Sequence, residues 1–145
     1  IVTGIAVTLD CGEYNNIHPT HKKEVGRRLA LQALYHVYHL LPEEMVYGPI
    51  FLKHKITNQT VTLYFDHAKE GFLQTADILT GFELADKTGV FIPCDAKIQD
   101  ETIILTVPEN FIPVHARYFW TDYAAVTLFG KNNIPVAPFH TGLEY

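Results

Sequence analysis

The sequence predicts an α/β segment followed by an antiparallel β-sandwich, with the boundary near Pro42. Residues 1–9 are β-branched and almost continuously apolar, as in a strand that is buried on both faces of a parallel sheet. Residues 20–41 carry apolar side chains at helical spacing. Beyond Pro42, short β-rich segments alternate with turn residues, which is typical of an all-β architecture.

The predicted strand and helix are joined by a polar loop over residues 10–18. This loop lies at the carboxyl end of the predicted strand, the edge at which open α/β sheets bind ligands. Pro19 suits the first turn of a helix, and Pro42 ends it because proline lacks an N–H to donate. One strand and one helix do not make a domain, so we expect residues 1–41 to be the end of a larger domain.

The predicted helix has an apolar side on which seven residues recur three or four positions apart: Val25, Leu29, Ala33, Leu34, Val37, Leu40 and Leu41. Arg27, Arg28 and Gln32 fall on another side.

The second part is predicted to consist of hairpins and single strands. The three predicted hairpins pair residues 49–57 with 60–66, 82–85 with 90–92, and 97–98 with 102–107. Two further strands are predicted over 114–119 and 124–129, and the Pro- and Gly-containing tail, 132–145, is expected to run along the surface.

Composition excludes several classes of protein and site. The 145 residues include 48% hydrophobic side chains, and the net charge is −5 without a long run of Lys or Arg, so we expect no nucleic-acid partner. No apolar run is long enough to span a membrane, so we expect no membrane partner. The chain contains no serine, so any serine nucleophile must lie on another polypeptide or on a missing upstream part.

Three smaller features concern processing and modification. The chain starts at Ile1 and its only methionine is Met45, which suggests a processed or cut product. Asn58 begins an N-glycosylation sequon, which has meaning only in a secreted eukaryotic protein. Cys11 and Cys94 are too few to establish a disulfide framework.

His18 is the strongest candidate for chemistry, because it follows a predicted buried strand and precedes a helix. A helix N-terminus disfavours the protonated imidazole, which keeps a histidine available as a general base near neutral pH. Such a base needs a group that orients its ring, and Asp10, Glu13 and Asn15 are the local candidates. The alternative is a histidine that only caps the helix.

Other candidate residues have simpler interpretations. His18 with His21, and His36 with His39, have the i, i+3 spacing that can share a metal, but no cysteine lies near them and we expect no metal site. Residues 117–120 form an aromatic cluster with an arginine, which can stack on sugars but more often packs into a core.

Two blocks far apart in the chain carry a family resemblance. The first comprises Thr3 to Asp10, Gly12-Glu13, Asn16-Ile17-His18-Pro19, Lys22 or Lys23, Val25-Gly26 and Arg28-Leu29-Ala30. The second comprises Arg117-Tyr118, Trp120, Leu128-Phe129, Ile134-Pro135, Ala137-Pro138-Phe139 and Thr141. In this order and spacing they resemble the sialate O-acetylesterases, which belong to the SGNH-hydrolase superfamily together with related acetylxylan esterases.

The resemblance implies a fold and an activity. Residues 1–41 would be the last strand and helix of an SGNH-type three-layer α/β/α catalytic domain, and residues 42–145 an antiparallel β-sandwich accessory domain. Members of this family remove acetyl groups from sugar hydroxyls, in the named branch from sialic acid. His18 matches the catalytic histidine of the last family block, whereas the serine and the oxyanion-hole residues belong to blocks that are absent here. No cofactor is implied, and we expect an extracellular, periplasmic or lysosomal location.

One departure from the family pattern affects the orienting group. SGNH hydrolases commonly place an aspartate three residues before the histidine, and here that residue is Asn15, while Asn16 stands where close relatives often have aspartate. An amide can orient the ring but cannot stabilise the imidazolium with a full charge. Either Asp10 or Glu13 folds back, or the acid comes from the missing part, or a backbone carbonyl orients a Ser–His dyad.

The sequence thus predicts the C-terminal portion of a carbohydrate O-acetylesterase, with His18 as general base and the serine on an upstream portion or partner chain. The substrate would be O-acetylated sialic acid or a related acetylated sugar, bound by residues that the sequence does not identify. The competing hypothesis is a non-catalytic carbohydrate-binding or structural β-sandwich module. That hypothesis predicts an exposed platform of Tyr and Trp residues and a His18 that faces solvent alone.

Overall fold

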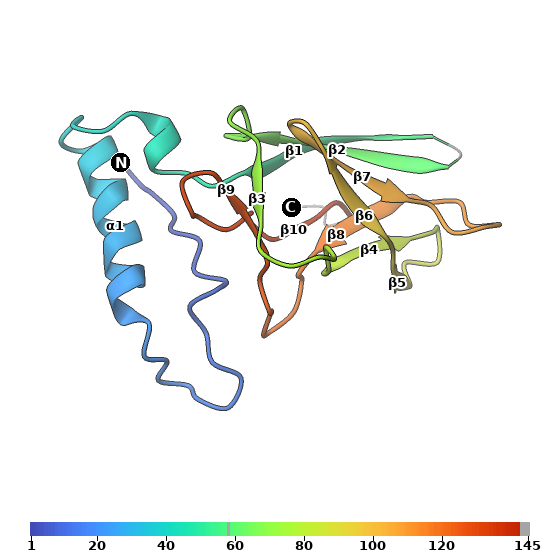
Figure 1. The fold of residues 1–145 in the computed structure, drawn as a ribbon, viewed down its shortest axis with the longest axis horizontal. Coiled ribbons are helices and arrows are strands. Elements are labelled where there is room, and N and C mark those ends of the chain that lie inside the picture. Colours follow the sequence, from blue (N-terminus) through green and yellow to red (C-terminus); the bar gives the residue numbers. More distant parts are fainter. Residues whose placement is uncertain (58, 143–145) are drawn as a thin grey trace.

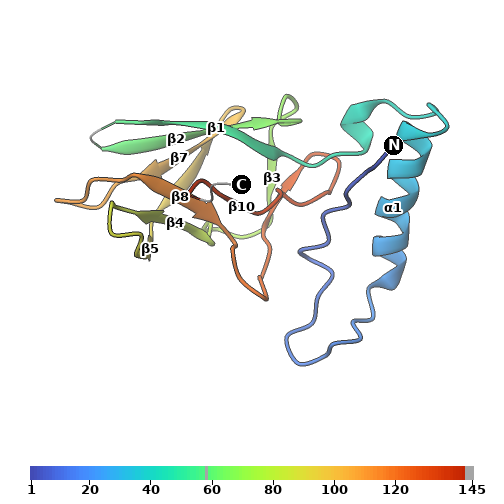
Figure 2. The same ribbon diagram turned by 180° about the vertical axis from the view of Figure 1, so that it is seen from behind.

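The computed structural model describes residues 1–57 and 59–142 and shows a small β-rich protein with a single α-helix beside its sheets (Figures 1 and 2). Helix α1 spans Lys22–His36, and the short 3₁₀ helix η1 spans Glu43–Met45. Within the described residues the strands are β1 (Ile50–Ile56), β2 (Thr60–Asp66), β3 (Phe72–Gln74), β4 (Phe82–Ala85), β5 (Phe91–Pro93), β6 (Ala96–Gln99), β7 (Thr102–Thr106), β8 (His115–Tyr118), β9 (Leu128–Gly130) and β10 (Phe139–His140).

All the strand pairs among the described residues are antiparallel, and two four-stranded sheets share one apolar core. The first sheet has the order β1-β2-β7-β6, the second the order β10-β8-β4-β5, and β3 pairs with β9 in a small third sheet. Alternate residues on β2 and β7, such as Leu63 and Ile103, are fully buried and lie opposite each other in register. Leu84 of β4 belongs to the same buried cluster, which therefore joins both large sheets.

The α/β fold class predicted from the sequence is wrong, and so is the SGNH-type three-layer α/β/α assignment of its first part. Residues 1–9 run as an extended segment alongside α1 and belong to none of the described strands. A β-branched run becomes a strand only where a neighbouring strand accepts its hydrogen bonds, and the described residues offer none to this segment. The fold is instead built from antiparallel sheets that follow the helix.

Helix α1 is shorter than predicted at both ends, because it starts at Lys22 rather than residue 20 and ends at His36 rather than residue 41. Its C-terminus unwinds through His39, whose φ of 55° is left-handed, and the Leu40 N–H donates to the Leu34 carbonyl at 2.9 Å. This local turn ends the helix before Pro42 is reached.

The predicted hairpins are confirmed: β1 pairs with β2, β4 with β5, and β6 with β7. Asn58, at the turn of the first hairpin and the start of the sequon, lies outside the described residues, as do residues 143–145 of the tail. The tail was predicted to run along the surface, but its described part does not, since Val136 is fully buried and β10 pairs with β8.

The domain boundary predicted between residues 41 and 42 stays a prediction. Among the described helices, none combines the length and apolar character needed to cross a bilayer.

Candidate functional site

His18 lies in a polar loop, residues 10–21, that connects the extended N-terminal segment to α1 and is called the His18 loop below (Figure 1). The loop is entered by a turn in which the Cys11 N–H donates to the Thr8 carbonyl at 2.9 Å. A second turn follows, in which the Asn16 N–H donates to the Glu13 carbonyl at 3.2 Å. These turns fold the chain back, so that the loop projects beyond the start of α1.

Glu13 organises the His18 loop from within. Its carboxylate accepts hydrogen bonds from the Thr20 N–H and hydroxyl, both at 2.7 Å, and from the Asn16 side-chain amide at 2.9 Å. The bond from the Thr20 N–H, followed by the two side-chain bonds, lowers the pKa of Glu13 to about 2. Glu13 is therefore ionised at neutral pH. Its hydrogen bonds link Asn16, which precedes His18 in the chain, to Thr20, which follows it.

Asp10 holds the base of the loop against α1. Arg28 is only 2% exposed, and its guanidinium donates to both Asp10 carboxylate oxygens at 2.5 and 2.7 Å and to the Val7 carbonyl at 2.7 Å. The same guanidinium donates to Glu24 at 2.8 Å. Burial alone would raise the pKa of Asp10, but the hydrogen bonds and the charge of Arg28 lower it below its ordinary value.

His18 itself is exposed, and its backbone N–H donates to the Asn16 side-chain oxygen at 2.9 Å. Among the described residues, neither the His18 imidazole nor the Asn15 side chain has a hydrogen-bond partner. His18 does not cap α1, because the N-cap position is taken by His21. The role of His18 as a general base, and the choice among Asp10, Glu13 and Asn15 as its orienting group, stay predictions.

The regions that contain the two sequence blocks of the family resemblance meet in space, since Leu9 and Gly12 of the first block and Pro138 of the second line one hollow. The ring of Tyr14 in the His18 loop contacts the ring of Tyr123, after β8, edge to face, with centroids 5.5 Å apart. A hollow of about 400 Å³ lies between the same two regions and is lined by residues 5–9, Gly12, Asp122 and Tyr123. The segment after β8 therefore borders the side of the molecule that carries His18.

The aromatic cluster at residues 117–120 divides between core and surface. Tyr118 is fully buried, as expected for a core strand. Arg117 donates to Glu83 at 2.6 Å and lies 4.2 Å from the ring centroid of Phe91. Trp120, by contrast, is 45% exposed. The dense run of aromatics signalled this cluster in the sequence, but only the structure separates the member that faces solvent.

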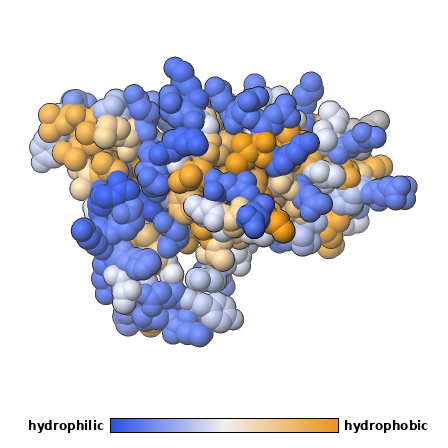
Figure 3. All heavy atoms as spheres, viewed as in Figure 1, coloured by the Kyte–Doolittle hydropathy of each residue, from blue (hydrophilic) through white to orange (hydrophobic). Residues whose placement is uncertain are grey.

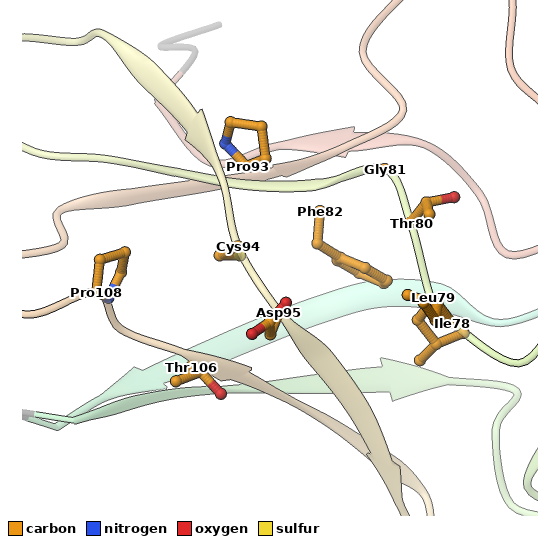
Figure 4. Close-up of a pocket in the computed structure, with 10 residues that line it drawn as sticks. All are labelled: Ile78, Leu79, Thr80, Gly81, Phe82, Pro93, Cys94, Asp95, Thr106 and Pro108. Atoms are coloured by element: carbon orange, nitrogen blue, oxygen red, sulfur yellow. The ribbon is translucent and has the colours of Figure 1, made fainter.

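A second hollow, of about 430 Å³, lies between β4 and β5 on one side and β6 and β7 on the other, and Cys94 is its candidate nucleophile (Figure 4). Phe82 and Cys94 line it, and both cysteines of the chain are free thiols. Burial, followed by the charges of Asp95 and Glu83, raises the pKa of Cys94 to about 12, which keeps the thiol protonated and unreactive at neutral pH. Across the described residues, no group of three or more His, Cys, Asp or Glu side chains is placed to hold a metal ion.

No family model matches the chain, and no curated protein matches it. Among solved structures, it is similar to a carbohydrate acetylesterase from Xanthomonas citri, with a TM-score of 0.84 and 30% sequence identity. The match covers 96% of this chain but 32% of that structure, so the chain spans about a third of the length of its structural neighbour. The similarity thus supports a relation to carbohydrate esterases, although not to those acting on sialic acid in particular.

Proposed function

We propose that this chain supplies the histidine-bearing portion of a carbohydrate O-acetylesterase. The observation that carries the proposal is the similarity of nearly the whole chain to one third of a carbohydrate acetylesterase, at 30% identity. The exposure of His18 agrees with it, because a general base must be open to its substrate. The serine comes from a complementary portion, since this chain contains none.

The mechanism is acyl transfer in two steps, in which His18 moves the protons. In the first step His18 takes the proton of the serine hydroxyl, and the serine oxygen attacks the acetyl carbonyl. The sugar oxygen then leaves with the proton from His18, and the acetyl group stays on the serine. In the second step water attacks this ester, its proton passes through His18 to the serine, and acetate is released.

The uncovered apolar surface of the N-terminal part supports the presence of a complementary portion. Leu29, Val37 and Leu40 on or just after α1 are 54%, 59% and 69% exposed. Figure 3 shows hydrophobic residues gathered over the C-terminal end of α1. Val37 and Leu40, together with Tyr38 at 64% exposed, follow the end of α1 within four residues, and a cluster of exposed apolar residues of this kind is typical of a surface that another polypeptide covers. We place the complementary, serine-bearing portion of the esterase against this surface.

The substrate class is O-acetylated sugars. The sequence resemblance favours O-acetyl esters of sialic acid, whereas the structural neighbour is described only as a carbohydrate acetylesterase. An extracellular, periplasmic or lysosomal location would suit either substrate.

The proposal is tested by producing this chain together with the two thirds of the Xanthomonas enzyme that have no counterpart in it, and by measuring acetate release from acetylated sugars. Co-purification of the two portions shows that they assemble. We expect His18→Ala to lower kcat by about 10³-fold or more, because removing one member of a proton-transfer unit disables the unit. His21→Ala, in the same exposed loop, is the matched control and should leave kcat within a few-fold of the wild type.

Wild-type acetate release from the His18→Ala variant in an assembled complex would contradict the role of His18. The competing function, a non-catalytic carbohydrate-binding module, is favoured by one observation, the absence of a partner for the His18 imidazole within the described residues. It predicts a complex that binds sugars but releases no acetate above the level of the complementary portion alone.

A further inference from the structure

We propose that the hollow beside Trp120 is a sugar-binding subsite that holds the pyranose ring of a neutral acetylated sugar. This inference rests on the proposed esterase function and specifies its substrate. The hollow has a volume of about 340 Å³ and is lined by Leu9, Phe119, Trp120, Thr121, Asp122 and Pro138. Small-molecule sites have volumes of about 300–1,000 Å³, so this one suits a single sugar ring rather than an extended chain.

The local fold places Trp120 at the surface. Phe119 has a φ of 39°, a left-handed conformation that a bulky residue rarely adopts, and this turns the chain out of β8. Its N–H donates to the Gly81 carbonyl at 2.9 Å, and its ring lies where a Cβ on Gly81 would come within 2.5 Å. Gly81 therefore makes room for Phe119, and Trp120 follows as a half-exposed ring.

The ring of Trp120 is also restrained from the side. His140 of β10 contacts it in a T-shaped arrangement, with ring centroids 5.6 Å apart. An aromatic ring held in one orientation can pack against the C–H face of a sugar with little loss of side-chain entropy. Trp120 is thus suited to act as the stacking platform of the subsite.

The polar groups of the hollow fit hydroxyls better than a carboxylate. Asp122 is exposed, and its two oxygens can accept hydrogen bonds from neighbouring sugar hydroxyls, while Thr121 adds a hydroxyl. None of the six described lining residues is cationic. The nearby Arg117 is engaged with Glu83 at 2.6 Å. The carboxylate of a sialic acid would therefore meet the like charge of Asp122, whereas a neutral sugar would not.

The hollow lies beside the region that carries His18. Leu9, which lines it, immediately precedes the His18 loop, and Asp122 also lines the adjoining hollow formed with Gly12. The contact between Tyr14 and Tyr123 joins the loop to the segment that carries Trp120. A sugar ring on Trp120 would therefore lie next to the loop that, in the proposed function, performs proton transfer.

Trp120 is the only tryptophan of the chain, so tryptophan fluorescence reports on this hollow alone. The experiment titrates this chain with methyl β-D-xylopyranoside as a neutral probe and with the methyl glycoside of N-acetylneuraminic acid as an anionic probe. We expect a saturable emission change with the neutral probe at millimolar concentration, and at least tenfold weaker binding of the anionic one.

Asp122→Ala should weaken binding of the neutral probe about tenfold, because it loses charge-assisted hydrogen bonds. Asp77→Ala, an exposed aspartate before β4, is the matched control and should bind like the wild type.

A flat titration with the neutral probe, unaltered binding by Asp122→Ala, or tighter binding of the anionic probe would each overturn the proposal. Failure of the subsite can be told apart from failure of the esterase function, because the titration needs no acetyl transfer. If acetate release depends on His18 but the neutral probe causes no emission change, the esterase function is supported and the sugar subsite is excluded. If the neutral probe binds but His18→Ala leaves acetate release unchanged, the sugar subsite is supported and the proposed esterase function is excluded.

Discussion

The β-rich part, residues 50–142, and the N-terminal part, residues 1–41, distribute polar and apolar side chains in opposite ways. In the β-rich part, Leu63 and Leu84 are fully buried in a core shared by two sheets. In the N-terminal part, the polar Arg28 is 2% exposed, whereas the apolar Leu29 beside it in sequence is 54% exposed. The most buried side chains of the β-rich part are therefore apolar, whereas those of α1 are a charged and a polar residue, Arg28 and Gln32.

The contact between the N-terminal segment and α1 illustrates this difference. Gln32 is 7% exposed and packs on Gly4, where a Cβ would come within 2.6 Å of the Gln32 side-chain oxygen. That oxygen has no hydrogen-bond partner among the described residues, and the amide nitrogen reaches the Val46 carbonyl only at 3.5 Å. The side of α1 that carries Arg28 and Gln32 is thus the side most deeply buried against this chain, whereas Leu29 faces solvent.

The largest effect is expected when a buried leucine of the β-rich part is replaced by alanine. The same replacement of an exposed leucine in the N-terminal part serves as the comparison. Leu84→Ala should lower the free energy of unfolding by about 2–5 kcal/mol, because it removes buried apolar surface and leaves a cavity. Leu29→Ala should change it by less than about 0.5 kcal/mol, since that side chain is already half in water. Urea unfolding followed by circular dichroism measures both values. Similar losses from the two substitutions would show that the comparison between the parts is mistaken.

A smaller and local effect is expected from removing the buried cation of the N-terminal part. Arg28→Ala should destabilise the packing of the His18 loop on α1 by about 1.5–3 kcal/mol, the range for hydrogen bonds to charged groups. Hydrogen exchange should become faster in residues 7–28 and stay unchanged in β7. Arg27→Ala is the control, because Arg27 lies beside Arg28 but is 44% exposed in its side chain. Equal hydrogen-exchange protection of residues 7–28 in the two variants would show that Arg28 is not the main contact between the His18 loop and α1.

Local patterns in the sequence predicted the three hairpins of the β-rich part but not β3 or β10, and the strand predicted over 124–129 matches β9 only at its end. Alternation on β2 and β7 and turn residues between strands identify hairpins, because the residues that pair are close in sequence. They also identified the loop that carries His18, although not its role. Residues 1–9 were assigned wrongly because an apolar β-branched run signals burial against some partner but does not say whether that partner is present.

The long-range contacts of the site could not be predicted from local patterns. Arg28 binds Asp10 across 18 residues of sequence, and nothing in the helical periodicity marks the arginine side as the one that faces this chain. Tyr14 likewise contacts Tyr123, which is distant in the sequence, and the segment leading to Tyr123 contains the left-handed turn at Phe119, a conformation that aromatic residues rarely adopt. The hollow beside Trp120 follows from that turn and therefore appears only in three dimensions.

Acidification should affect the N-terminal part and not the β-rich part, without any substitution. The expected loss of hydrogen-exchange protection is the smallest of the three effects. The pKa values of Glu13 and Glu24 are lowered from 4.5 to about 2, the first by bonds from Thr20 and the second by Arg27 and Arg28. A carboxylate with a lowered pKa in the folded state stabilises that state above its ordinary pKa, and this contribution is lost as the pH falls toward the lowered value. We therefore expect residues 10–28 to lose hydrogen-exchange protection between pH about 4.5 and about 2, while β7 keeps it, because Ile103 and Leu105 carry no titratable group. Simultaneous loss in both regions would mean that the N-terminal part and the sheets unfold as one cooperative unit.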